Sequence, residues 1–392
     1  MNERLMHCSL DLTRFTSQRP QAAYLHVPFC QHRCGYCNFT LIVNRDDLIE
    51  KYITAIRLEL ESRGDHGPVT TLFVGGGTPT YLPADKLEQL LELLMNWFPL
   101  EDGGEFSIEA NPCDITESKA AILSAAGVTR VSLGAQSFNE QKLRSLDRFH
   151  SESDVALAVK LLRKYEFDIS LDLIFGAPEE KLEVWENDLN KALQLEPDHL
   201  STYGLTFEKG TLFYNQLIHG QISPIEETLD LQMYKCGINT LEQAGFEHYE
   251  ISNFSRPGHR CQHNEGYWQL QGHFAVGAGA SRFVSGIRET NHRSTTTYIK
   301  KMLAGDSPVA ARENLSAEAS AREKIVFGLR RLEGISLSDF YRATGFDVVK
   351  LLKKPLHRFI SQGFLSLKNN QLQLTEQGLY ISDSLWPEFL IE

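Results

Sequence analysis

The sequence predicts an α/β fold, a partial (βα)6 barrel followed by a small C-terminal module of helices and a winged-helix-like hairpin. Three observations lead to this prediction. Between residues 22 and 207, six short β-rich segments alternate with segments of helical periodicity, which is typical of a parallel sheet. Polar residues and glycines follow at the carboxyl ends of those segments. In residues 318–392, three helical segments precede a hairpin.

The six strands are expected where apolar or β-branched residues form short runs, most of which end at Gly, Pro or a polar residue. They cover residues 22–29, 70–77, 105–112, 129–136, 168–176 and 200–207. Apolar residues at helical spacing predict intervening helices over 48–60, 84–97, 155–164 and 184–195. Such units in series form either an open doubly wound sheet or part of a (βα) barrel.

A barrel would bring the carboxyl ends of its parallel strands to one rim, where ligands bind. Each of the six strands contributes at least one residue that could contact a ligand. These are Cys30 after the first strand, Gly75–Thr78 on the second, Glu109 and Asn111 on the third, Gln136 on the fourth, Asp172 within the fifth, and Tyr203 and Thr206 near the end of the sixth. The sequence therefore predicts a binding site at this rim.

The chain divides into four predicted regions. Residues 1–21 form an N-terminal leader, 22–210 the partial barrel, 211–317 a region that covers the barrel, and 318–392 the C-terminal module. The covering region contains a helix near 228–243 and a loop-rich segment over 253–281.

The C-terminal module has helices near 321–332, 337–344 and 347–362, followed by a hairpin whose Asn369–Asn370 turn suits positive φ. Its third helix carries four basic residues that would suit DNA binding, Lys350, Lys353, Lys354 and Arg358. Residues 310–392 nevertheless contain 11 Lys and Arg against 10 Asp and Glu, so no basic field is evident. This near-equal number of positive and negative charges favours a packing module over a DNA-binding module.

Composition restricts the protein's location and partners. The net charge of −12 argues against general nucleic-acid binding. No apolar run approaches a transmembrane span, and residues 1–15 lack a signal-peptide core. Seven cysteines without secretion signals indicate thiols that bind metal in a reducing cytoplasm.

Three of those cysteines, Cys30, Cys34 and Cys37, follow one another at C-x3-C-x2-C spacing. Thiolates select zinc, copper(I) or iron–sulfur clusters, and structural zinc normally has four protein ligands. His26 and His32 are near, so a Cys3His zinc site is one alternative. The other is a [4Fe–4S] cluster whose fourth iron remains open to an outside ligand.

This cysteine spacing after a first barrel strand resembles the signature of the radical S-adenosylmethionine (SAM) superfamily. The resemblance implies a partial TIM-like barrel, a [4Fe–4S] cluster and SAM bound to its open iron, with a 5′-deoxyadenosyl radical formed on reduction. The segment GGGTPT (75–80) resembles the family's glycine-rich strand end. Tyr36, between the second and third cysteines, resembles the aromatic residue beside the adenine.

Further motifs resemble the branch that contains oxygen-independent coproporphyrinogen III oxidase. They run in order across residues 24–211 and continue in the tail, 363–383, as YLHVPFCQHRCGYCNF, GGGTPTYL, IEANP, RVSLGAQSFN, DLIFGAP, YGLTFEKGT and GFLSLKNNQLQLTEQGLYISD. The resemblance implies a set of residues that contact SAM. They are Tyr24, Tyr36, Gly76, Gly77, Thr78, Glu109, Gln136, Arg148 and Asp172.

Two features depart from the oxidase. Its motif continues with a fourth cysteine two residues after the third, where this chain has Asn38-Phe39, and the leader before Tyr24 is short. Both departures are similar to the sister group called HemW, described as haem chaperones, and put decarboxylation of a porphyrinogen in doubt.

The segment HNEGYW (263–268) resembles the H-N-x-x-Y-W motif of haem-trafficking members of this branch. The resemblance implies haem ligation by His263, with Cys261 as a competing ligand and Tyr267 and Trp268 facing the porphyrin. The alternative is structural, with His263 capping a loop and both aromatic residues filling the core. Zinc bound by His259, Cys261 and His263 would need a further ligand.

Taken together, the resemblance implies a cytoplasmic protein that carries a [4Fe–4S] cluster and SAM, binds haem as cargo and delivers it to apo-haem acceptor proteins. An electron donor is implied if the cluster is reduced, and no nucleic acid is expected. The rival is an enzyme, a radical SAM oxidative decarboxylase acting on coproporphyrinogen III. A DNA-binding metalloregulator is a third, disfavoured reading. Peripheral membrane association and the choice between monomer and homodimer stay open.

Overall fold

The computed structural model describes residues 19–64 and 67–391, and confirms the predicted α/β class. Residues 1–18 of the expected leader lie outside this range. All six predicted strands are present. They are β1 (Ala22–Val27), β4 (Val69–Gly76), β5 (Leu100–Ala110), β6 (Arg130–Gln136), β7 (Asp168–Phe175) and β8 (His199–Gly204).

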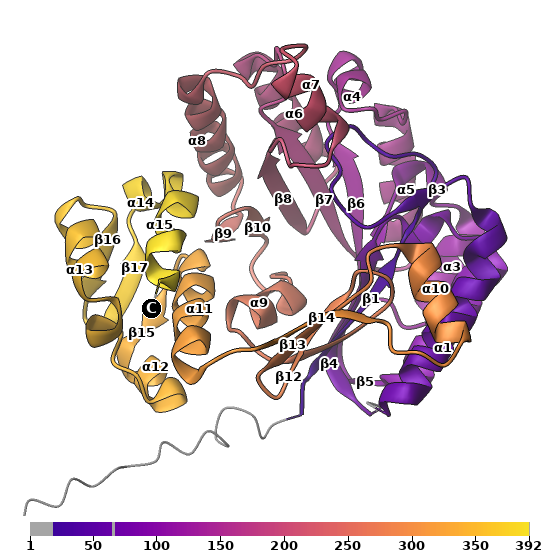
Figure 1. The fold of residues 1–392 in the computed structure, drawn as a ribbon. Helices are drawn as coiled ribbons and strands as arrows, with labels where there is room; N and C mark the ends of the chain where they lie inside the picture. Colours follow the sequence, from indigo (N-terminus) through magenta and orange to yellow (C-terminus); the bar gives the residue numbers. More distant parts are fainter. Residues whose placement is uncertain (1–18, 65–66, 392) are drawn as a thin grey trace, which may run out of the picture.

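These six strands are parallel neighbours in the order β1-β4-β5-β6-β7-β8, which is also their order along the chain. A doubly wound sheet would reverse its strand order at a switch point. The sequential order therefore selects the partial barrel from the two predicted alternatives. The strands curve around a common interior with the helices outside them (Figure 1).

The outer helices cover the barrel because each has one apolar face. α2 (Ala84–Trp97) buries Leu87, Leu90, Leu91 and Leu94, which recur at helical spacing. The other helices that pack along this side of the sheet are α1 (Ile49–Arg63), α3 (Glu117–Ala125), α5 (Glu152–Arg163) and α6 (Leu182–Gln194), with the short α4 (Glu140–Ser145) before α5. Their buried side chains form one core with the outward-facing side chains of the strands.

Short strands extend the sheet at both edges. β11 (His273–Val276) pairs in parallel with β1 and is followed by antiparallel β12 (Ser281–Val284), β13 (Ile287–Asn291) and β14 (Val309–Asn314). At the other edge, β10 (Asn253–Ser255) pairs with β8 and with β9 (Glu247–Glu250). The loop-rich prediction for 253–281 is therefore wrong, since this segment also contains α9 (Gln262–Trp268). Elements of three to seven residues carry too little periodicity to predict.

Two short strands, β2 (Phe29–Cys30) and β3 (Ile42–Val43), lie between β1 and α1. Three further helices lie between the barrel strands and the C-terminal module. They are α7 (Leu212–Ile218), α8 (Glu227–Gln243) and α10 (Thr295–Leu303). No helix in the described part of the chain is both long and apolar enough to span a bilayer.

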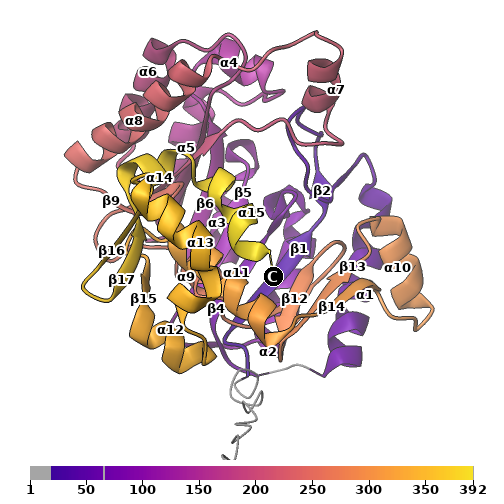
Figure 2. The ribbon, with the colours of Figure 1, turned by 60° about the vertical axis from the view of Figure 1, so that its left-hand side comes forward.

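The C-terminal module has the predicted order of helices and hairpin. α11 (Ala317–Arg330), β15 (Ile335–Ser336), α12 (Leu337–Thr344) and α13 (Val348–Ser361) precede the hairpin β16 (Leu365–Lys368) and β17 (Gln371–Leu374), and α14 (Glu376–Tyr380) and α15 (Ser382–Leu390) follow. The hairpin turn at Asn369 and Asn370 has φ of 50° and 67°, which confirms the expected positive values. The module has a core of its own and lies beside the barrel, with α9 between them (Figures 1 and 2).

Candidate functional site

A cavity of about 970 Å3 opens at the carboxyl ends of the barrel strands and reaches the C-terminal module. Eleven of the residues predicted to hold the cluster or SAM line it. They are Cys30, Cys34, Tyr36, Cys37, Gly76, Gly77, Thr78, Glu109, Gln136, Arg148 and Asp172. Tyr24 is the exception. Its hydroxyl group lies 3.1 Å from Nδ1 of His26, deeper in the barrel.

The three cysteines follow β1, on β2 and the turn after it. The turn is closed by a hydrogen bond from the Cys37 amide to the Cys34 carbonyl at 3.1 Å. Burial raises the pKa of the Cys30 thiol to about 12. Burial also opposes ionisation of Cys34, but His32 and Arg148 outweigh it and lower the pKa of that thiol. Because thiolates bind metal, the cationic neighbours favour a metal-bound Cys34.

The three Sγ atoms are spread too widely to share one ion. Within residues 19–64 and 67–391, only Asp168, Asp198 and His259 place three such ligand atoms within 4.8 Å of one another. A single zinc ion with Zn–S bonds of about 2.3 Å needs closer thiolates. A cluster attaches its thiolates to different iron atoms, so this spread fits [4Fe–4S] better than zinc.

The glycine-rich end of β4 forms a close-packed ledge beside the cysteines. Gly76 has φ of +108°, and a Cβ on Gly77 would lie 2.7 Å from the Val27 carbonyl oxygen. Neither position tolerates a side chain, so backbone atoms line this wall. The Gly76 amide donates to Oε2 of Glu109 at 2.8 Å, which fixes that carboxylate at the cavity wall.

Two half-buried carboxyl groups, those of Glu109 and Asp172, lie at the rim. Burial raises the pKa of Glu109 to about 7, with the Gly76 amide opposing this shift and Asp172 adding to it. Burial likewise raises the pKa of Asp172 to about 6, while hydroxyl groups of Ser201 and Ser132 oppose it. Paired carboxyl groups held in this way suit a cationic ligand that carries hydroxyl and ammonium groups, as SAM does.

Arg148 provides the opposite charge at the cluster end of the cavity. Its Nη2 donates to the Gly134 carbonyl at 2.7 Å, and Nη1 lies 3.9 Å from Sγ of Cys34. Its Nε atom is buried and has no hydrogen-bond partner among the described residues. An unpaired buried donor beside the carboxyl pair fits the carboxylate of an amino-acid ligand.

Binding of SAM is expected to strengthen as pH rises from 6 to 8. Burial raises the pKa of Glu109 from 4.5 to about 7 and thereby favours its neutral form. The neutral carboxyl group stabilises the folded protein at low pH, and this stabilisation is lost as the pH rises from 4.5 through about 7. A cationic ligand requires the ionised form, so affinity at pH 6 should be up to about tenfold weaker than at pH 8. Equilibrium dialysis of labelled SAM against cluster-loaded protein measures this change.

Two variants test whether this pH dependence of SAM binding comes from Glu109. Glu109→Gln should flatten it, whereas Glu208→Gln, at an exposed carboxylate of the same cavity, should leave it unchanged. A wild-type affinity that does not vary between pH 6 and pH 8, or an equal slope in Glu109→Gln, contradicts the assignment of Glu109.

The four residues predicted to handle haem lie elsewhere. In the described conformation, Cys261, His263, Tyr267 and Trp268 do not line the cavity. They belong to the start and body of α9, which closes the amino-terminal end of the barrel. The Nδ1 atom of His263 lies 2.9 Å from Oγ1 of Thr71, and Nε2 lies 3.2 Å from the Tyr267 hydroxyl group.

His263 is therefore placed as a core residue. It is 2% exposed, its ring stacks on Phe73 with centroids 5.1 Å apart, and burial lowers its pKa to about 3. Neither ring nitrogen is free for a haem iron unless α9 moves. Haem ligation by His263 stays a prediction, and the geometry favours the structural alternative.

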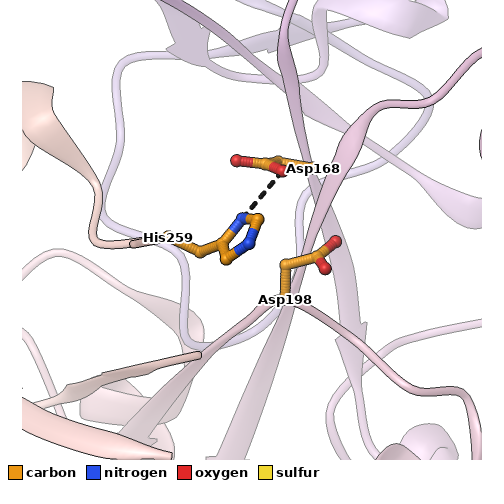
Figure 3. A group of neighbouring side chains, drawn as sticks. All are labelled: Asp168, Asp198 and His259. Atoms are coloured by element: carbon orange, nitrogen blue, oxygen red, sulfur yellow. Dashed lines mark hydrogen bonds and ion pairs between the residues drawn. The ribbon is translucent and has the colours of Figure 1, made fainter. Parts of the chain in front are cut away.

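His259, a second histidine near this motif, also has a structural partner. Its Nδ1 lies 2.9 Å from Oδ1 of Asp168, and Asp198 completes the group (Figure 3). Both carboxylates are already paired with arginines, Asp168 with Arg130 at 3.4 Å and Asp198 with Arg163 at 2.6 Å. The arrangement fastens the segment after β10 to the barrel floor. It does not supply the further ligand that a His259, Cys261 and His263 zinc site would need.

Several residues of the cavity were not predicted. Tyr234 comes from α8, Tyr380 from α14, and Arg330 from the last turn of α11. They belong to the part of the lining that α8 and the C-terminal module supply. No motif marks them, because their position depends on how the C-terminal module packs against the barrel.

Comparison with known proteins agrees with this architecture. Residues 24–192 match the radical SAM superfamily, and residues 315–381 match the HemN C-terminal domain. The chain is 32% identical to "Heme chaperone HemW" of Lactococcus lactis subsp. lactis over 96% of this chain and 98% of that protein. It is 31% identical to the Escherichia coli protein of the same name over 95% and 99%. Among solved structures, coproporphyrinogen III oxidase (HemN) of Escherichia coli superposes with a TM-score of 0.85, at 22% identity, over 96% of this chain and 92% of that one.

Proposed function

The chain belongs to the HemW family of radical SAM proteins, and from this premise we propose that it binds haem and delivers it to haem-requiring proteins. The observation that carries this proposal is the similarity to haem chaperones along almost the entire chain, barrel and C-terminal module included. The protein carries a [4Fe–4S] cluster and SAM, as its superfamily does.

We assign the cluster to Cys30, Cys34 and Cys37. SAM would lie between the glycine-rich ledge, the carboxyl groups of Glu109 and Asp172, and Arg148, all of which line one cavity. When bound, the cluster supplies an electron-transfer centre whose open iron accepts an outside ligand. The chain itself supplies cationic donors at Cys34 and a wall of backbone atoms at Gly76 and Gly77.

Room for cargo supports the proposal. Ligand pockets commonly measure about 300–1,000 Å3, and this cavity of about 970 Å3 is at the upper limit. It continues beyond the predicted SAM residues to the aromatic residues Tyr234 and Tyr380. A second, planar ligand could therefore bind beside the first.

Phe39 favours the chaperone over the oxidase. It lies at the cavity and is 63% exposed, at the position where the oxidase has a cysteine. The likeness to the oxidase structure, at 22% identity, concerns the fold alone.

A haem titration followed at the Soret band tests the proposal. Wild-type protein is expected to give a saturating Soret change, and His263→Ala is expected to give the same spectrum because both of its ring nitrogens are already bonded. Absence of saturable binding by wild type would overturn the chaperone proposal. A lost or shifted Soret band in His263→Ala alone would instead restore His263 as the axial ligand.

The enzyme alternative has its own test. Reduced, cluster-loaded protein is incubated with SAM and coproporphyrinogen III without oxygen, and the porphyrins are separated by chromatography. We expect no protoporphyrinogen. Its formation would contradict a function limited to haem handling.

Several partners follow from the proposed function. They are haem, one or more apo-haem acceptor proteins, and an electron donor if the cluster is reduced. The thiol-rich site suits a reducing compartment such as the cytoplasm.

A further inference from the structure

We propose that Arg330 binds a carboxylate of the cargo, a haem propionate, at the end of the cavity formed by the C-terminal module. This inference rests on the proposed haem-chaperone function. Two arginines line the cavity, Arg148 beside Cys34 and Arg330 on α11. Arg148 already faces the predicted SAM site, whereas Arg330 is the cation in the part of the lining that also contains the carboxylates of Asp230 and Asp383.

Arg330 has capacity for a further partner. Its Nε atom is buried without a hydrogen-bond partner in the described part of the chain. Its one recorded ion pair is with Asp383 at 3.9 Å, and the Asp383 side chain is 90% exposed. A pair of this length and exposure contributes little, so a carboxylate that enters the cavity can take its place.

The buried Glu250 near Arg330 does not close this site. Its Oε1 atom accepts from the Ser252 amide at 3.1 Å, whereas Oε2 has no hydrogen-bond partner among the described residues. Burial raises the pKa of Glu250, and the charge of Arg330 opposes this shift without forming an ion pair with the carboxyl group. The guanidinium donors of Arg330 are therefore not taken up by Glu250.

The wall around Arg330 suits a flat apolar ring with carboxylates at one edge. The rings of Tyr234 and Tyr380 lie 5.9 Å apart in a T-shaped arrangement, and Phe175 stacks on Tyr234 at 6.1 Å. All three residues line the cavity, and Ser382 and Ser384 add hydroxyl groups on the same side. Aromatic faces beside one cation and hydroxyl donors match the amphipathic outline of haem.

Trp268 gives the HNEGYW motif a part in this site. The Arg330 guanidinium carbon lies 4.6 Å from the centre of the Trp268 ring, and Trp268 also contacts Phe327 at 6.3 Å. The Lys324 ammonium donates to the Gln269 carbonyl at 2.5 Å, which ties α9 to α11. We infer that Trp268 is a positioning residue that holds Arg330 toward the cavity.

The test compares haem with its dimethyl ester, which lacks the propionate charges. Wild type should bind haem roughly 10- to 100-fold more tightly than the ester, because a charge-assisted hydrogen bond is lost. Arg330→Gln should bind haem and the dimethyl ester with equal affinity. Its affinity for haem should be roughly 10- to 100-fold lower than that of wild type. Arg342→Gln, at an exposed arginine of the same module, should behave like wild type.

Three outcomes of this comparison are decisive. No haem binding by wild type would refute the proposed function itself. Haem binding with equal discrimination in wild type and Arg330→Gln would refute this inference and leave the function standing. Thermal melts check that Arg330→Gln is folded, and Trp268→Phe, which keeps an aromatic ring, should discriminate better than Trp268→Leu. Equal discrimination in both Trp268 variants would remove the positioning role.

SAM also carries a carboxylate, so a second experiment measures SAM binding to find out which of the two ligands Arg330 serves. Arg330→Gln should leave SAM affinity unchanged in equilibrium dialysis, whereas Arg148→Gln should weaken it. If Arg330→Gln instead weakens SAM binding and leaves haem discrimination intact, Arg330 serves SAM and the inference fails.

Discussion

Cys34→Ala is expected to lose the [4Fe–4S] cluster. Cys34 is 8% exposed, and the side chains of Arg148 and His32 both face its sulfur atom. Removing it leaves two thiolates and two cationic neighbours without their anionic partner, so no stable cube can form on this chain. Anaerobic reconstitution followed by iron and labile-sulfide analysis should give values near background.

Cys113→Ala is the matched control for that variant. Cys113 is an exposed cysteine in the 3-10 turn Pro112–Asp114 that follows β5, and it does not line the cavity. It should retain the full iron and sulfide content. Wild-type cluster content in Cys34→Ala, or a loss in Cys113→Ala, would contradict the assignment. Haem titration of the Cys34→Ala protein should still saturate, because the Arg330 end of the cavity is unchanged.

Lys142→Ala is expected to destabilise the barrel by about 3–5 kcal/mol, since it leaves buried carboxylates without a counter-charge. The Lys142 ammonium lies 2.6 Å from Oε1 of Glu180 and 3.0 Å from Oδ2 of Asp188. These side chains are at most 4% exposed. Asp188 also accepts from the Ser137 hydroxyl group and the Phe138 amide, both at 2.7 Å. The network therefore fixes the loop between β6 and α4.

The midpoint of thermal unfolding measures this loss. Lys191→Ala is the control, because Lys191 joins α6 to α5 through Glu152 with side chains 28% and 51% exposed. An exposed pair contributes at most about 1 kcal/mol. A Lys142→Ala midpoint equal to that of Lys191→Ala would show that the buried network contributes little.

The barrel could be predicted because its information is local. Six strands carry β-rich runs that end at polar residues, and a parallel sheet places those ends together. The C-x3-C-x2-C spacing of Cys30, Cys34 and Cys37 is also local, because all three residues lie within eight positions of the chain, and it predicted a metal-bound turn. Strand order then separated the barrel from the doubly wound sheet, a choice that strand content alone leaves open.

The rest depends on packing between distant segments. His263 has the residue type of a haem ligand, and only its contacts with Thr71 and Tyr267 reveal a core position. Arg330 is an ordinary helical arginine in the sequence, and it reaches the cavity because α11 packs on α9. β11 pairs in parallel with β1, which lies about 250 residues earlier in the chain. The four residues of β11 carry no local pattern from which this long-range pairing could be predicted.

Haem transfer to an apo-haem acceptor protein tests the central claim most directly. Haem-loaded protein is mixed with increasing acceptor, and the acceptor's own Soret band is followed by stopped flow. Delivery through a complex predicts a rate that rises with acceptor concentration and exceeds the rate of haem loss to a passive scavenger. A rate that is independent of acceptor concentration and equal to passive loss would contradict the account.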